Sequence, residues 1–169
     1  MAEPMAIADT AKKQALLVVD VQPSFAIPDG IVYQINNLAR RIYTIATVER
    51  HDEAETPFER QLGWTPGKSD DSLIKSDRVF IKHGYLPPVA MIEHLKSLAI
   101  ERVFVCGIQA DTCCLAAGFM LFDAGLHPTL LKWLSVGSSL DPTANLGADL
   151  WQHHFGSVLY RESDFTLTT

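Results

Sequence analysis

The chain of 169 residues has only three cysteines, no block of basic residues and no long apolar run. Three is an odd number, so the cysteines do not indicate a disulfide framework, and a reducing, cytoplasmic location is expected. The net charge of −6 gives no electrostatic footprint for nucleic acid. The apolar run at residues 15–19 is too short for a signal-peptide core or a membrane span.

What the chain does contain is enough apolar material for one core. Hydrophobic residues make up 47% and charged residues 20% of the sequence, which is typical of a soluble globular protein. The length suits one domain, residues 1–169, whose first 13 residues are expected to form a loose leader. No internal repeat, low-complexity segment or linker divides the chain, so we expect a single domain.

Apolar runs alternate with helical periodicity along the sequence. Strands are predicted at residues 15–19, 42–48, 78–81, 103–107, 126–134 and 157–160. Helices are predicted at about 31–41, from 88 to 98, from 113 to about 124, and through 146–155, the last capped by Asp141 or Thr143. This alternation predicts a Rossmann-like parallel sheet with helices on both faces. The pattern weakens between residues 49 and 77, and a connection of that length is usually functional or carries short helices.

Three reactive side chains stand at the ends of predicted strands. Asp20 follows the first strand, Lys82 follows the third, and Cys113 begins the helix after the fourth. Ligands of parallel sheets bind at the carboxyl ends of the strands, so these residues are expected to converge there. A cysteine in the first turn of a helix also faces unpaired N–H groups and the positive end of the helix dipole, which favour a thiolate. We therefore interpret Cys113 as a nucleophile.

Other interpretations exist for each of these residues. A lone cysteine is more often a small buried hydrophobe, as we expect for Cys106 and Cys114, and a lone lysine is usually solvated. The chain could be a non-catalytic or redox-sensing protein that keeps the fold. A dinucleotide-binding domain is disfavoured because no Gly-x-Gly-x-x-Gly turn follows the first strand. An aspartyl phosphatase is disfavoured because Gln22 stands where that chemistry needs a second aspartate.

Residues 17–25 (LVVDVQPSF), 79–85 (VFIKHGY) and 105–114 (VCGIQADTCC) resemble motifs of the isochorismatase-like cysteine hydrolases. That family includes nicotinamidases and N-carbamoylsarcosine amidohydrolases. The resemblance implies a three-layer α/β/α fold with a six-stranded sheet, and a catalytic triad at Asp20, Lys82 and Cys113. It also implies a cis peptide bond between Ile108 and Gln109, and a homodimer or higher homo-oligomer.

The resemblance implies hydrolysis of a non-peptide C–N bond in a small-molecule amide, through a thioester on the cysteine. The backbone N–H groups of Gln109 and Cys113, around the Ile108–Gln109 turn, would form an oxyanion hole. No cofactor is expected. The residues expected to bind substrate or shape the pocket are Gln22, Phe25, Trp64 and Tyr85.

Two features depart from the family or strain the interpretation. Nicotinamidases hold a metal through an Asp-x-His pair and a further histidine, whereas this chain has Glu49-Arg50-His51 and Pro57 at the matching places. We therefore expect no metal site, and a metal-using nicotinamidase remains the alternative. In addition, a lysine two strands away from Asp20 has to span about 10 Å of sheet, which only its long stem and the sheet twist can achieve.

Overall fold

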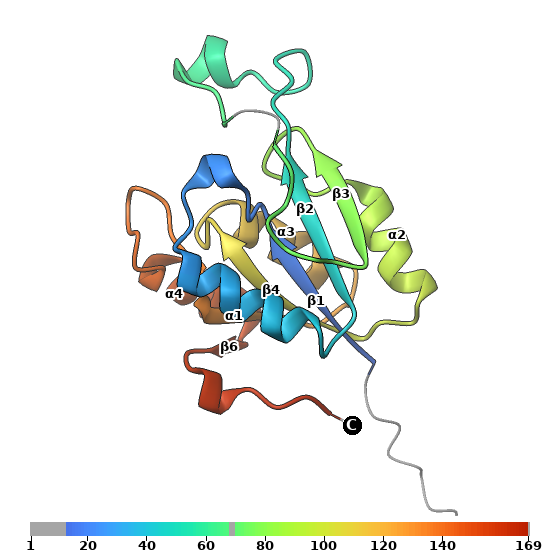
Figure 1. Cartoon of the computed structure of the whole chain (residues 1–169). Coiled ribbons are helices and arrows are strands. Elements are labelled where there is room, and N and C mark those ends of the chain that lie inside the picture. The colour runs from blue at the N-terminus through green and yellow to red at the C-terminus, as the bar shows by residue number, and fades with distance from the viewer. Residues whose placement is uncertain (1–12, 68–69, 169) are drawn as a thin grey trace, which may run out of the picture.

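The computed structural model, which describes residues 13–67 and 70–168, contains one sheet of parallel strands (Figure 1). The six strands lie in the order β3-β2-β1-β4-β5-β6. The expected leader falls, apart from residue 13, outside the described residues. The strand bounds are β1 Gln14–Val19, β2 Thr44–Glu49, β3 Arg78–Lys82, β4 Arg102–Ile108, β5 Pro128–Val136 and β6 Val158–Leu159.

Helices cover both faces of the sheet, which confirms the three-layer α/β/α architecture. The helices are α1 (Asp29–Ala39), α2 (Val89–Ser97), α3 (Cys113–Asp123) and α4 (Asn145–Phe155). Met91 of α2, Leu121 of α3 and Trp151 of α4 belong to one core cluster, whereas Ile35 of α1 belongs to the cluster on the opposite face. In the described ranges, no helix is both long and apolar enough to span a lipid bilayer.

The central strand β1 is apolar throughout because both of its faces are covered. Leu17 and Val19 pack into the cluster under α2, α3 and α4, and Leu16 and Val18 pack into the cluster under α1. All four side chains are fully buried. Alternation between two cores, rather than between core and solvent, explains the continuous apolar run in the sequence.

The order of the strands places a topological switch point between β1 and β4. From β1 the chain runs outward to β2 and β3, and it then returns to β4 on the other side of β1. Gly107, opposite Val19, has φ +120°, and a Cβ atom there would lie 2.2 Å from the Val19 carbonyl oxygen. The close approach of the two strands therefore requires glycine, and ligands of such sheets bind at this point.

Of two loop segments, the first agrees with the sequence prediction of short helices and the second differs from its prediction in detail. The long connection after β2 contains one short helical turn, Phe58–Leu62, and rises beyond the carboxyl edge of the sheet (Figure 1). The residue that caps α4 is Ala144 in a left-handed conformation, rather than Asp141 or Thr143. Asp141 nevertheless accepts a hydrogen bond from the N–H of Leu146 at 2.6 Å. Asp141 therefore does bond an N–H group in the first turn of α4, but from three residues before the N-cap position.

Candidate active site

Asp20 lies directly after β1, and its backbone adopts a left-handed conformation with φ +51°. A non-glycine residue in this region is strained, and such residues cluster at functional sites. The hydroxyl of Thr47 on β2 donates a hydrogen bond to Asp20 Oδ1 at 2.8 Å, and the Asp20 N–H donates to the Thr47 carbonyl at 3.2 Å. Thr47 therefore fixes this carboxylate, although sequence analysis did not single it out. Its only signal was a hydroxyl within an apolar strand.

Lys82 reaches Asp20 across the intervening strand β2. The Lys82 ammonium lies 2.8 Å from Asp20 Oδ2, and both side chains are almost completely buried. The same Nζ donates to the carbonyl of Gly84 at 2.6 Å. Burial on its own lowers the pKa of Lys82, but the nearby negative charges, Asp20 foremost, outweigh it and raise the pKa above its ordinary value. Lys82 therefore stays charged.

Cys113 is the first residue of α3, and its Sγ lies 3.4 Å from Lys82 Nζ. Burial raises the pKa of the thiol to about 12, and Lys82 lowers it only in part. The helix N-terminus and the ammonium therefore do not yield a thiolate at rest. A reaction that uses this sulfur has to remove the thiol proton as substrate binds or reacts. Cys106 and Cys114 are fully buried, as expected for core residues.

Glu49, the last residue of β2, is a second buried carboxylate beside Lys82. Its Oε2 accepts a hydrogen bond from Lys82 Nζ at 2.8 Å, and the residue is only 4% exposed. Burial raises the pKa of Glu49, against the opposing effect of Lys82. From the sequence, Glu49 is notable only as a departure from the metal-ligand pattern of nicotinamidases. Its position at the same strand edge as Asp20 was the signal that could have found it.

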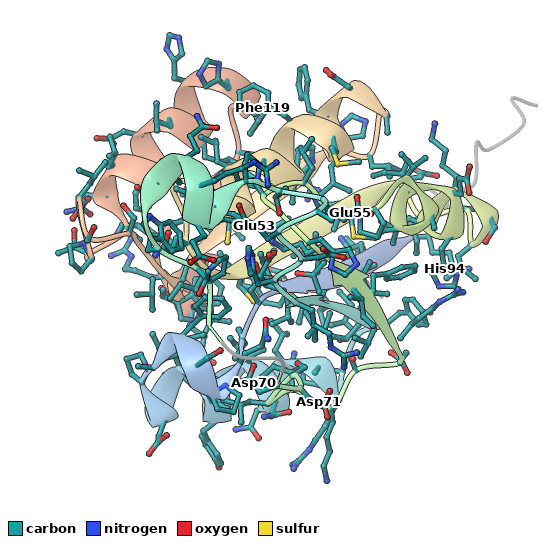
Figure 2. All side chains as sticks on the ribbon, turned by 90° about the horizontal axis from the view of Figure 1, so that it is seen from above. Glu53, Glu55, Asp70, Asp71, His94 and Phe119 are labelled. Atoms are coloured by element: carbon teal, nitrogen blue, oxygen red, sulfur yellow. The ribbon has the colours of Figure 1, made fainter. Side chains whose placement is uncertain are left out.

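Gln22, expected to bind substrate, is fully buried and is not among the residues that line the cavity described below. Its side-chain amide instead pairs with the backbone of Glu49. Nε2 donates to the Glu49 carbonyl at 3.1 Å, and Oε1 accepts from the Glu49 N–H at 2.8 Å. Nε2 also donates to Asp70 Oδ1 at 2.7 Å. Gln22 therefore holds the end of β2 and the segment around Asp70, which lies on the α1 side in Figure 2.

A cavity of about 270 Å³ opens between these groups and the loops above them. Figure 2 looks down on this edge of the sheet, with the loop that carries Glu53 and Glu55 passing over it. Three of the four expected substrate-contacting residues line the cavity, as do both residues of the Ile108–Gln109 peptide bond, which is cis as expected. The lining residues are Asp20, Phe25, Glu49, Phe58, Trp64, Thr65, Pro66, Gly67, Gly84, Tyr85, Ile108, Gln109 and Cys113.

The residues at the place of the nicotinamidase metal do not fit a metal ion. Oε2 of Glu49 is bound by the Lys82 ammonium, and His51 Nε2 lies 3.0 Å from Glu53 Oε2. Within residues 13–67 and 70–168, no three side chains of the His, Cys, Asp or Glu type are grouped as metal ligands would be. We therefore route no chemistry through a metal.

The chain is similar to known proteins in its three-dimensional structure, whereas comparisons of its sequence find no match. No family model matches the chain, and no curated protein sequence matches it. Among solved structures, N-carbamoylsarcosine amidase from Thermoplasma acidophilum has a TM-score of 0.70 at 21% identity, covering 88% of this chain and 96% of that one. PnC1 from L. infantum, solved in complex with nicotinate, has a TM-score of 0.74 at 21% identity, covering 92% and 96%.

A third structure, an isochorismatase-like hydrolase from Alkaliphilus metalliredigens, has a TM-score of 0.71 at 15% identity and covers 86% of this chain and 93% of that one. All three similarities extend over nearly the whole length of both chains. The chain therefore has the fold of the isochorismatase-like hydrolases.

Proposed function

We propose that this protein is a cysteine hydrolase that cleaves the C–N bond of a small-molecule amide. The observation that carries the proposal is that Lys82 lies within 3.4 Å of both Asp20 and Cys113, and that Asp20 and Cys113 line one cavity. Proteins of the same fold include an N-carbamoylsarcosine amidase, which supports an amide as substrate.

The first half of the reaction needs a base because the Cys113 pKa is raised to about 12. In the proposed mechanism the Asp20 carboxylate takes the thiol proton, and the sulfur attacks the carbonyl carbon of the amide. The tetrahedral intermediate collapses as the C–N bond breaks. Asp20 returns the proton to the leaving nitrogen, which departs as ammonia or an amine, and the acyl group stays on Cys113 as a thioester.

The second half of the reaction hydrolyses the thioester. Asp20, again a carboxylate, takes a proton from water, and the resulting hydroxide adds to the thioester carbonyl. Collapse breaks the C–S bond, releases the carboxylic acid and returns the proton to the sulfur. Lys82 stays protonated throughout, holds the Asp20 carboxylate in place and stabilises the thiolate as it forms.

The negative oxygen of both tetrahedral intermediates is assigned to the backbone N–H groups of Gln109 and Cys113. Neither group donates a hydrogen bond to another part of the described chain, and both residues line the cavity. Hydrogen-bond donors at such a position typically contribute about 3–4 kcal/mol each to the stability of the transition state.

The raised pKa also disfavours the redox-sensing alternative. Cysteines that sense oxidants are accessible and have a low pKa, so that the thiolate is present at rest. Cys113 has a raised pKa, and its sulfur lies beside the same Lys82 ammonium that contacts the Asp20 carboxylate.

The proposal is tested by measuring ammonia release from a panel of small amides and ureides. We expect turnover by the wild type, none by Cys113→Ala, and retention of activity by Cys114→Ala, which removes the neighbouring sulfur from the core. Circular dichroism checks that both variants fold, and rapid quenching with intact-protein mass spectrometry detects the thioester. Turnover that survives in Cys113→Ala, or a wild type that is inert over the whole panel, contradicts the proposal.

A further inference from the structure

Glu49 presents a buried carboxylate oxygen that the described protein leaves without a partner. Its Oε2 is bound by Lys82, but its Oε1 has no hydrogen bond to any described residue. The residue is held in place by Gln22, which bonds both its N–H and its carbonyl. A buried acceptor without a partner is unfavourable, so each such atom requires an explanation.

The charges around Lys82 show which kind of group Oε1 lacks. One ammonium contacts two carboxylates, those of Asp20 and Glu49, so this cluster has an excess of acidic over basic groups. Conversion of the Cys113 thiol into a thiolate adds another negative charge. A ligand that brings N–H donors or positive charge compensates this excess, whereas a carboxylate increases it.

The remaining walls of the cavity are largely aromatic. The ring of Phe58 lies 5.2 Å from that of Trp64 and 5.4 Å from that of Tyr85, measured between centroids. Phe25 also lines the cavity. These walls suit a flat, apolar substituent on the substrate, while the polar groups gather at the floor of the cavity, where the strands end.

We propose that Glu49 is a specificity-determining residue whose Oε1 accepts a hydrogen bond from a substrate N–H. The inference rests on the proposed function and narrows its substrate class. The site takes planar primary carboxamides or ureides that are neutral or cationic, and it rejects molecules that carry a carboxylate beside the reacting carbon.

The test uses alkylation of Cys113 by three reagents that share one electrophilic carbon. Iodoacetamide carries N–H donors, methyl iodoacetate carries none, and iodoacetate carries a negative charge. In each case a C–S bond forms, iodide leaves and the thiol proton passes to the buffer. Rates are measured at pH 9 by peptide mass spectrometry, and each is divided by the rate of the same reagent with N-acetylcysteine.

In the wild type, we expect iodoacetamide to be favoured over both of the other reagents. Glu49→Gln replaces one carboxylate oxygen with an N–H donor and removes the negative charge. It should reduce the preference for iodoacetamide over methyl iodoacetate, and the preference over iodoacetate, at least tenfold each. Glu55→Gln on the exposed loop is the matched control and should leave both preferences unchanged. A Glu49→Gln variant that keeps the preference for iodoacetamide over the methyl ester overturns the inference, even if its discrimination against iodoacetate falls.

Protection of the wild type gives a second measurement that needs no variant. Benzamide should slow the alkylation of Cys113, and benzoate at the same concentration should not; equal protection by the two contradicts the inference. These failures differ from failure of the proposed function. If Cys113 reacts but shows no selectivity, only the role of Glu49 is lost, whereas a Cys113 inert to every reagent removes the nucleophile and the inference with it.

Discussion

At the scale of single residues, the Lys82 ammonium holds two buried carboxylates together. It lies 2.8 Å from an oxygen of Asp20 and 2.8 Å from an oxygen of Glu49, and both carboxylates are almost completely buried. Burial of charge is unfavourable unless the charges are paired. The same contacts that arrange the site therefore also determine whether the chain tolerates it.

Lys82→Met is expected to destabilise the fold because it leaves two buried carboxylates without their partner. Removing one partner of a buried ion pair typically costs about 3–5 kcal/mol. Urea unfolding followed by circular dichroism measures the change. Lys75→Met, at an exposed position, is the control and should change stability by no more than about 0.5 kcal/mol. A Lys82→Met variant as stable as this control contradicts the assigned contacts.

Glu49→Gln is expected to change stability in a way that depends on pH. Burial raises the folded-state pKa of Glu49 above 4.5. Below the unfolded pKa the carboxyl is protonated in both states and its burial carries no charge penalty. The penalty develops as pH rises from the unfolded pKa to the folded pKa, because ionisation then favours the unfolded chain. The variant should therefore gain stability relative to the wild type between pH 4 and pH 8, measured by urea unfolding. If the variant instead loses stability relative to the wild type over that range, the attraction of Lys82 for ionised Glu49 is stronger than the unfavourable effect of burial, and the prediction is wrong.

At the scale of secondary-structure elements, the contact between β1 and β4 sets the geometry of the site. Asp20 follows one strand, and the turn with Ile108–Gln109 ends the other. The two strands pair from Gln14 opposite Arg102 to Val19 opposite Gly107. A displacement at the end of this pairing moves Asp20 relative to α3, which carries Cys113.

Gly107→Ala should therefore damage both stability and activity. The added Cβ would lie 2.2 Å from the Val19 carbonyl oxygen, and the residue has φ +120°. We expect a loss of about 2–4 kcal/mol in unfolding free energy, together with loss of turnover. In Gly30→Ala, the new Cβ meets nothing within 4 Å, so stability should change by less than about 1 kcal/mol. Equal stability of the two variants would show that β1 and β4 are not packed this closely.

The periodicity of the sequence predicts the elements and the strand ends, but not every group at the site. Asp20, Lys82 and Cys113 were predicted as site residues because each lies at or shortly after the end of an apolar run. Thr47 and Glu49 were not predicted as site residues, because the sequence does not show which side chain a polar residue inside or at the end of such a run will contact. Gln22 was placed against substrate because it lies near Asp20 in the chain. Only the fold shows that its amide bonds the backbone of β2.

At the scale of the whole molecule, the resemblance to the family leads us to expect self-association. On α3, Phe119 is 40% exposed and Phe122 is 51% exposed, and Figure 2 shows Phe119 on the outside of the molecule. Sedimentation equilibrium at micromolar concentration should give a mass of at least two chains of 18.7 kDa. A mass of one chain at every concentration contradicts this expectation.

The strand order has one more consequence. Asp20 and Lys82 precede the exposed Leu86 in the chain, whereas Cys113 follows it, and the two parts meet where β1 lies beside β4. Under the proposed mechanism, neither fragment of a chain divided at Leu86 turns over substrate alone, because Asp20 and Cys113 then belong to separate molecules. Hydrolysis by a mixture of the two fragments would therefore show that they had associated and formed the site again.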